Sequence, residues 1–292
     1  MSTILLIDSC SDLPLTYVEE NKNIIDIIGM PIEIDDDEFI DDFGKSYSHK
    51  DYFNKLRDGK MPSTGLINIY RFTKKFTEQY KKGNSVIYLG FSANLSGTFN
   101  NALLAKEEVK SEFPEADIEI IDTAAASIGE GVLVVQAIEM LKDGKSKEDI
   151  IKWVETNKYK ANHWFAVDDL HFLKNGGRVS STSATVGTLL NVKPILTVDK
   201  KGVLKSYSNV RGRKKAIKFL VGKFEEHVID CEKTTLIIGH GDCEEDALKI
   251  KEMITKEFNL KNIIVSQLSA TIASHVGPNM IALAFLGQER ES

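Results

Sequence analysis

The sequence has little of what several common classes of protein require. It has only three cysteines in 292 residues, and none of them stands in a C-x-x-C pair. This pattern excludes a disulfide framework and a thiolate metal site, and it suits a reducing cytosol, so we expect a cytoplasmic protein. The six histidines are scattered and form no H-E-x-x-H motif. We therefore expect no metal and no other cofactor.

Long apolar runs and an excess of basic residues are also missing. No run approaches the roughly 18 apolar residues that a membrane-spanning helix needs. The first apolar stretch ends at Asp8 and has no basic region before it, so we do not expect it to act as a signal peptide. The 37 basic and 43 acidic residues give a net charge of −6, which argues against binding of nucleic acid.

What the sequence does contain is the material of an ordinary globular protein with a sheet and helices. Hydrophobic residues make up 42% of the chain, and short apolar runs alternate with longer amphipathic stretches. This alternation predicts an α/β fold with two lobes, each a mostly parallel sheet flanked by helices. The predicted strands cover residues 3–7, 85–91, 118–121, 163–167, 194–198, 204–210, 235–239, 263–267 and 281–286. The predicted helices cover residues 52–58, 70–81, 99–113, 128–142, 147–158, 213–227, 244–258 and 270–275.

Length and a polar interruption predict two domains. A chain of 292 residues exceeds the size of a typical single domain, and a polar region covers residues 157–162. We place a boundary there, with an N-terminal domain over 1–160 and a C-terminal domain over 161–292. Within the second domain, the β-rich runs on either side of residues 199–202 predict a hairpin whose turn uses Gly202.

The loop at 92–98 (SANLSGT) is the most informative candidate site. It follows a predicted strand and precedes a predicted helix, and it holds three hydroxyl residues and a glycine. Hydroxyls and free N–H groups at a helix N-terminus can hold a carboxylate or phosphate, helped by the helix dipole. The same segment is equally consistent with a simple helix cap formed by Ser96 or Thr98. Local sequence leaves these two interpretations open.

Four other loops have plainer local interpretations. Residues 8–14 (DSCSDLP) read as a helix start that shapes a ligand loop, and 61–65 (MPSTG) as a Pro/Ser/Gly loop with adjacent hydroxyls. Residues 170–179 contain an Asn-Gly-Gly turn. His275 precedes a rigid Val-Gly-Pro break, where it is either a core histidine or a hydrogen-bonding contact for a ligand's head group. Apolar residues beyond that turn are candidates to line a tunnel, although core packing is the commoner role: Leu189, Leu190 and Val192.

Taken together and in order, these segments resemble the DegV family of fatty-acid-binding proteins. The resemblance rests on motifs spread over essentially the whole chain: Asp8-Ser9 with Asp12-Leu13-Pro14, Pro62 and Thr64, LSGT at 95–98, Asp122-Thr123, Leu170 and Leu173 with GGRV at 176–179, Lys193-Pro194, and His275 with Gly277-Pro278. One departure is the run Gly65-Leu66-Ile67-Asn68, where family members often have Ser-Gln-Pro-Ser. A neighbouring hydroxyl is therefore missing beside Thr64.

The resemblance implies a carrier rather than an enzyme. The C-terminal lobe would enclose the tail of a long-chain fatty acid, and the carboxylate would be presented to a kinase subunit that forms an acyl-phosphate. By position, Thr64 and Ser96 would bind the carboxylate with His275 as the third contact, and Gly97 and Thr98 would support the loop. Arg178 and Arg211 are candidates for partner or structural contacts. We also expect a monomer that makes at most transient contact with membranes.

Two other classes of function stay open as alternatives. One is a lipid ester hydrolase with Ser96 as nucleophile, His275 as base and Asp122 orienting the base, although no G-x-S-x-G elbow is present. The other is a phosphate or nucleotide binder, because Gly144-Lys145-Ser146 partly matches a P-loop and Gly239-His240-Gly241 partly matches a dinucleotide fingerprint.

A basic cluster enters a predicted helix at Arg211, Arg213, Lys214 and Lys215. Cations at the start of a helix oppose its dipole, which leaves a partner-facing patch open beside the commoner solvated face.

Overall fold

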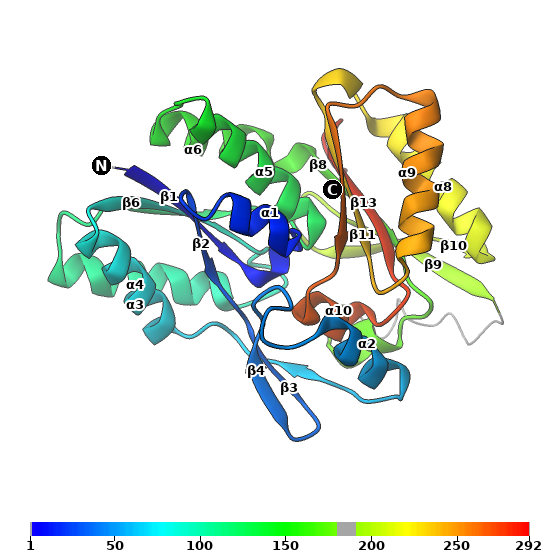
Figure 1. Cartoon of the computed structure of the whole chain (residues 1–292), viewed down its shortest axis with the longest axis horizontal. Helices are drawn as coiled ribbons and strands as arrows, with labels where there is room; N and C mark the ends of the chain where they lie inside the picture. The colour runs from blue at the N-terminus through cyan, green and yellow to red at the C-terminus, as the bar shows by residue number, and fades with distance from the viewer. Residues whose placement is uncertain (1, 180–190, 292) are drawn as a thin grey trace.

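The computed structural model describes residues 2–179 and 191–291, and its strands and helices alternate along most of the chain (Figure 1). The strands are β1 (Ser2–Asp8), β2 (Ile25–Ile28), β3 (Pro31–Ile34), β4 (Asp37–Ile40), β5 (Ser63–Thr64), β6 (Asn84–Gly90), β7 (Ile118–Asp122), β8 (Ala161–Ala166), β9 (Val192–Val198), β10 (Leu204–Arg211), β11 (Thr235–His240), β12 (Asn262–Gln267) and β13 (Ile281–Leu286). The helices are α1 (Leu15–Glu20), α2 (His49–Arg57), α3 (Ile69–Lys81), α4 (Thr98–Glu112), α5 (Ile128–Lys142), α6 (Lys147–Asn157), α7 (His171–Asn175), α8 (Arg213–His227), α9 (Glu244–Glu257) and α10 (Ala270–Val276).

The first sheet is fully parallel and has the strand order β2-β1-β6-β7. Its central strands β1 and β6 are almost continuously apolar and buried, as expected for parallel strands that are covered on both faces. Their carboxyl ends lead into the loops at 8–14 and 91–97. Both loops therefore lie at the same edge of the sheet, where ligands of α/β proteins usually bind.

The second sheet corrects the expectation that both lobes are mostly parallel. Its order is β10-β9-β8-β13-β11-β12, and only β11 and β12 pair in parallel. The short turn between β9 and β10 forces an antiparallel hairpin, as predicted, and Gly202 in that turn has a φ of +77°. Strand β13 inserts between β8 and β11 and runs antiparallel to both. Alternating apolar and amphipathic segments do not specify which strands become neighbours.

A small third sheet projects from the first lobe as a hairpin of β3 and β4, with β5 paired to β3 (Figure 1). Strand β5 contains only two residues, and Thr64 lies opposite Ile32 in the pairing. This pairing holds the backbone of Thr64 although the flanking residues form an open loop. The sequence did not predict strands β2 to β5, because each is short.

Helix α5 joins the two lobes into one molecule. It contacts β1 and β6 of the first sheet and β8, β11 and β13 of the second. Most of its residues are buried, including both ends of the run Val132–Val135, so the helix is enclosed by the two lobes over most of its surface. Helices α8 and α9 cover the opposite face of the second sheet (Figure 1). The fold is thus two-lobed α/β, as predicted.

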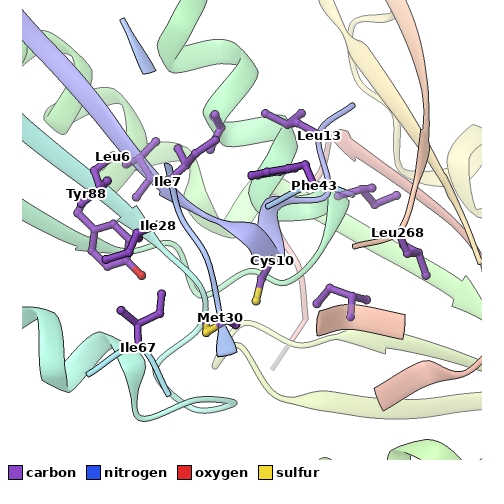
Figure 2. Packing of buried hydrophobic residues seen from close by; sticks show 14 of the residues in the cluster. Leu6, Ile7, Cys10, Leu13, Ile28, Met30, Phe43, Ile67, Tyr88 and Leu268 are labelled. Atoms are coloured by element: carbon purple, nitrogen blue, oxygen red, sulfur yellow. The ribbon is translucent and has the colours of Figure 1, made fainter. Parts of the chain in front are cut away.

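The main apolar core extends through both lobes. Figure 2 shows its part around β1, where Leu6, Ile7 and Tyr88 pack together and Cys10 follows the end of the strand. Leu268, from the second lobe, belongs to the same cluster. The strands of the first and third sheets come from residues before 161, and the described strands of the second sheet begin at Ala161. We therefore retain the boundary at residue 160 as a proposal.

In the described part of the chain, no helix combines the length and the apolar character needed to cross a membrane. Within the same residues, no group of three or more His, Cys, Asp and Glu side chains is arranged to hold a metal ion.

Candidate ligand-binding site

One pocket brings together the three residues proposed to hold a head group. Thr64, Ser96 and His275 all line it, and they come from β5, the loop before α4, and α10. The pocket contains about 850 Å³ of space free of protein atoms, counting the part that opens to solvent. These three side chains are neither fully buried nor fully exposed, which places them where the cavity meets the surface.

Thr64 and His275 are joined directly. Thr64 Oγ1 lies 2.9 Å from His275 Nε2. Burial, together with the charge of Arg178, lowers the pKa of His275 to about 4, so the imidazole is neutral at pH 7. The other ring nitrogen, Nδ1, is buried and has no hydrogen-bond partner among the described residues.

Ser96 belongs to a chain of hydroxyl groups at the start of α4. Ser96 Oγ donates to Thr98 Oγ1 at 3.1 Å and accepts from the Thr98 backbone N–H at 3.2 Å. The N-cap residue is Gly97, which has no side chain that could cap the helix. Neither Ser96 nor Thr98 is the N-cap residue, but the Ser96 hydroxyl binds the N–H of the first helical residue, so its predicted capping role is confirmed in part. This 15-residue helix starts with N–H groups that an anion can use.

The two candidate arginines lie in different places. Arg178 lines the pocket, donates from Nε to the carbonyl of Leu95 at 3.3 Å, and donates from Nη1 to the carbonyl of Gly176. Arg211 is exposed at the end of β10, opposite Val192, and is not among the residues described as lining the pocket. The structure therefore brings Arg178, but not Arg211, to the proposed head-group site.

The other residues of the basic cluster also differ in their surroundings. Arg213 is half-buried and donates to Asp246 at 2.8 Å and to the carbonyl of Asn279 at 2.6 Å, which is a structural arrangement. Lys214 and Lys215 are exposed. Only Arg211 and the two lysines thus present a solvent-facing basic surface.

Most of the pocket wall is apolar, and several of its polar groups are hydrogen-bonded within the protein. Ser127 donates to Asp12, Thr271 Oγ1 donates to Asp41 at 2.5 Å, and His163 Nε2 accepts from the Ala126 N–H at 3.3 Å. Two further lining atoms, His163 Nδ1 and Trp164 Nε1, are buried without a hydrogen-bond partner among the described residues. The wall beyond the head-group residues is thus mostly, but not entirely, apolar. The apolar lining includes Met30, Leu66, Phe91, Leu95, Ile128, Phe165, Leu173, Val198, Leu204, Ile272, Val276, Met280 and Leu283.

Residues of three predicted strands form part of the cavity wall. Phe91, Phe165 and Leu283 belong to or adjoin predicted strands, and no local signal separates a cavity-lining residue from a packed one. Figure 2 shows Cys10 and Met30, two further lining residues, together at the end of β1. Of the predicted tunnel residues, Leu189 and Leu190 lie outside the described residues, and Val192 pairs with Arg211 in the sheet.

Helix α10 is held in place by contacts with the first lobe. Asp12 accepts from the Ser269 N–H and Asp41 from the Thr271 N–H, each at 2.8 Å. Tyr52 and Ser274 hydroxyls lie 2.6 Å apart in the buried contact between α2 and α10. The loop at 8–14, predicted to shape the ligand loop, therefore also positions the helix that carries His275.

The arrangement does not assemble a hydrolytic triad. His275 bonds to Thr64, and no hydrogen bond joins it to Ser96 among the described residues. Asp122 accepts from the backbone N–H groups of Ala124 and Ala93, at 2.8 and 3.3 Å. Neither the nucleophile–base contact nor the base–acid contact of a triad is present.

The two partial nucleotide motifs have structural roles. Gly144 has a φ of +71° in the turn between α5 and α6, and Ser146 forms a capping box with Asp149 at the start of α6. His240 is buried at the end of β11. Neither segment lines the pocket that contains Thr64 and His275.

Comparison with known proteins agrees with this architecture. A family model described as "Uncharacterised protein, DegV family" matches residues 2–288. A DegV domain-containing protein of Clostridium perfringens is 43% identical over 288 residues, covering 99% of this chain and 98% of that protein. A second DegV domain-containing protein, from Streptococcus pyogenes serotype M1, is 36% identical over 289 residues, covering 99% of each chain.

Solved structures show the same fold over the full length. A DegV lipid binding protein from Thermotoga maritima has a TM-score of 0.87 and 28% identity, with 100% of both chains covered. A DegV family protein from Thermus thermophilus, described by its fatty acid binding, also has a TM-score of 0.87 and 28% identity, over 99% of this chain and 100% of that one. Since the family model and the relatives span nearly every residue, the chain belongs to the DegV family.

Proposed function

We propose that this protein is a fatty-acid carrier that holds the carboxylate at Thr64 and Ser96 and buries the acyl tail in the adjoining cavity. Because residues of both lobes line this cavity, the proposal places the tail between the lobes rather than inside the C-terminal lobe alone, as we expected from the sequence. The observation that carries the proposal is the meeting of two hydroxyl residues, His275 and an apolar cavity in one pocket. The fatty-acid binding of structural relatives supports it.

The energetics favour this division of the ligand. Burial of each methylene is worth about 0.8 kcal/mol, so a dozen contribute on the order of 10 kcal/mol before the costs of binding are subtracted. An unpaired carboxylate in the same place would cost several kcal/mol. Hydroxyl and N–H donors replace its water shell through charge-assisted bonds, which are roughly twice as strong as neutral ones.

The buried ring nitrogen of His275 indicates how the donors are arranged. If Nδ1 carried the proton, a buried N–H would lack an acceptor, which proteins rarely tolerate. We infer that Nε2 carries it and donates to Thr64 Oγ1. The Thr64 hydroxyl hydrogen then remains free to point at the carboxylate, so His275 acts by orienting Thr64.

Lipid analysis of the protein tests the carrier function. Extraction and mass spectrometry of protein purified after recombinant expression should find long-chain fatty acid at up to one molecule per chain. Delipidated protein should take up added fatty acid, and an ester-hydrolysis assay should give only background rates. Absence of lipid together with no uptake would exclude the carrier function, and Ser96-dependent hydrolysis would favour the esterase.

We further propose that the bound carboxylate is presented to a separate kinase subunit for acyl-phosphate formation. Arg178 is half-buried at the cavity, and Arg211, Lys214 and Lys215 are exposed elsewhere on the second lobe. These basic side chains support a partner that carries acidic or phosphate groups. The test is acyl-phosphate formation with a candidate kinase subunit and ATP. Arg211→Glu should slow it, whereas Lys251→Glu on the exposed face of α9 should not. Equal rates would remove Arg211 from the contact.

A further inference from the structure

Two glycines mediate the contact between α7 and α10. A Cβ atom on Gly176, directly after α7, would lie 2.2 Å from His275 Nδ1. A Cβ atom on Gly277, directly after α10, would lie 2.4 Å from Cδ2 of Phe172. Each helix thus ends in a glycine that receives a ring from the other helix, and neither position has room for a side chain.

The backbone does not explain the glycine at position 176. Gly176 has φ −71° and ψ −6°, a conformation that any residue adopts. Gly177 and Gly277, by contrast, have φ values of +70° and +73°, which favour glycine. The Asn-Gly-Gly turn needs one left-handed glycine, at 177. The missing side chain at 176 is therefore accounted for by the approach of the His275 ring.

We propose that Gly176 is a positioning residue: its missing side chain seats the His275 ring against α7 and so aims Nε2 at Thr64. This inference rests on the proposed fatty-acid function and deepens it. It states that the site prefers an ionised head group because α7 packs against His275 and so fixes the direction of the Thr64 hydroxyl. The ring is confined from both sides, by Gly176 at Nδ1 and by Thr64 at Nε2.

The same turn also reaches the other half of the head-group site. The side chain of Arg178 donates to the carbonyl of Gly176 and to that of Leu95, the residue before Ser96. Residues 176–178 therefore lie against the His275 ring and contact the loop that carries Ser96. A displacement of the ring at 176 changes the Thr64 donor first, because Thr64 is the described hydrogen-bond partner of His275.

A glycine-to-alanine substitution tests the inference. Delipidated Gly176→Ala protein and wild type are compared for hexadecanoic acid and hexadecanol, by competition with a fluorescent fatty acid. We expect about a tenfold loss of affinity for the acid, the size of one well-placed hydrogen bond to a charged group, and less than about a threefold loss for the alcohol. The matched control is Gly222→Ala in α8, where no atom would meet the new Cβ within 4 Å.

A double substitution separates positioning from general damage. His275→Ala removes the ring and makes room for the new methyl group, so Gly176→Ala should cause no further loss of acid affinity in that background. If the losses of acid affinity in the two single variants simply add in the double variant, the inference is overturned. The same holds if Gly176→Ala leaves the acid affinity unchanged, or if it lowers the affinities for acid and alcohol equally. Failure of wild type to bind either lipid would instead refute the carrier function.

Discussion

Thr64 Oγ1 and His275 Nε2 lie 2.9 Å apart although 211 positions separate them in the chain. Thr64 belongs to a two-residue strand of the first lobe, whereas His275 is on the last helix of the second. Folding of both lobes is therefore needed before this pair exists. The pair lies where the apolar cavity meets the surface, so a charged group held there can stay close to water.

Removal of the Thr64 hydroxyl should weaken binding of the acid more than binding of the alcohol. Thr64→Ala should lower the affinity for a fatty acid by about tenfold to a hundredfold, because a charge-assisted bond is worth about 1.5–3 kcal/mol. Thr64→Ser, which keeps the hydroxyl, should stay close to wild type. Competition binding measures both, with Ser63→Ala as control on the neighbouring exposed hydroxyl. Equal losses for acid and alcohol would contradict the assigned role.

Ser96→Ala should have a similar selective effect, through a different segment. It removes the hydroxyl that bonds to Thr98 and leaves the Thr98 N–H without its described acceptor. We expect about a tenfold loss of acid affinity and a loss of stability below about 1 kcal/mol. Binding and urea denaturation check the two numbers, with Thr73→Ala in α3, whose hydroxyl donates to Glu108 at the surface, as the control. A variant that binds the acid normally would remove Ser96 from the site.

The stability of the lipid-free protein should fall in acid partly through His275. Its pKa is about 4 in the folded state against 6.5 for the free side chain, so the unfolded chain takes up the proton first as pH falls. The contribution of neutral His275 to the free energy of unfolding is complete above pH 6.5 and is lost as the pH falls from 6.5 to 4. The loss amounts to at most about 3 kcal/mol. Denaturation of wild type and His275→Gln across this range should give a shallower decline in the variant. Parallel curves would indicate that His275 titrates normally.

Tyr52→Phe should destabilise the contact that holds α10. The tyrosine is fully buried, and its hydroxyl lies 2.6 Å from that of Ser274. Because Ser274 donates to the carbonyl of Ala270, Tyr52 is the donor in this pair. Its loss leaves a buried oxygen without that partner, at a cost of about 1–2 kcal/mol in the free energy of unfolding. Tyr47→Phe, whose hydroxyl bonds to Asp37 near the surface, should cost less. Equal losses of stability in the two variants would mean that burial of the Tyr52 hydroxyl does not increase the cost of losing its hydrogen bond.

Much of the local structure could be predicted from residue patterns. The runs at 3–7 and 85–91 form β1 and β6, and the hairpin around Gly202 has its glycine in the left-handed region. Helix α10 begins at Ala270, as expected. These features depend on neighbours in the chain, namely apolar periodicity, capping and turn chemistry.

The site was anticipated only through the ordered motifs. Locally, Ser96 could equally have been a cap residue, and His275 a core histidine. Their meeting in one pocket with Thr64 depends on three separate elements that the chain brings together. The functional assignment of these residues stays a prediction for the binding experiments above.

By itself, the sequence determined the α/β class, most strands and helices, and the family resemblance, because these follow from local patterns and ordered motifs. Only the tertiary structure decided that β13 pairs antiparallel with β8 and β11, and that α5 is shared by both lobes. It also decided that Gly176 makes room for His275. Each of these depends on contacts between segments far apart in the chain, and their geometry is settled by packing of the whole core.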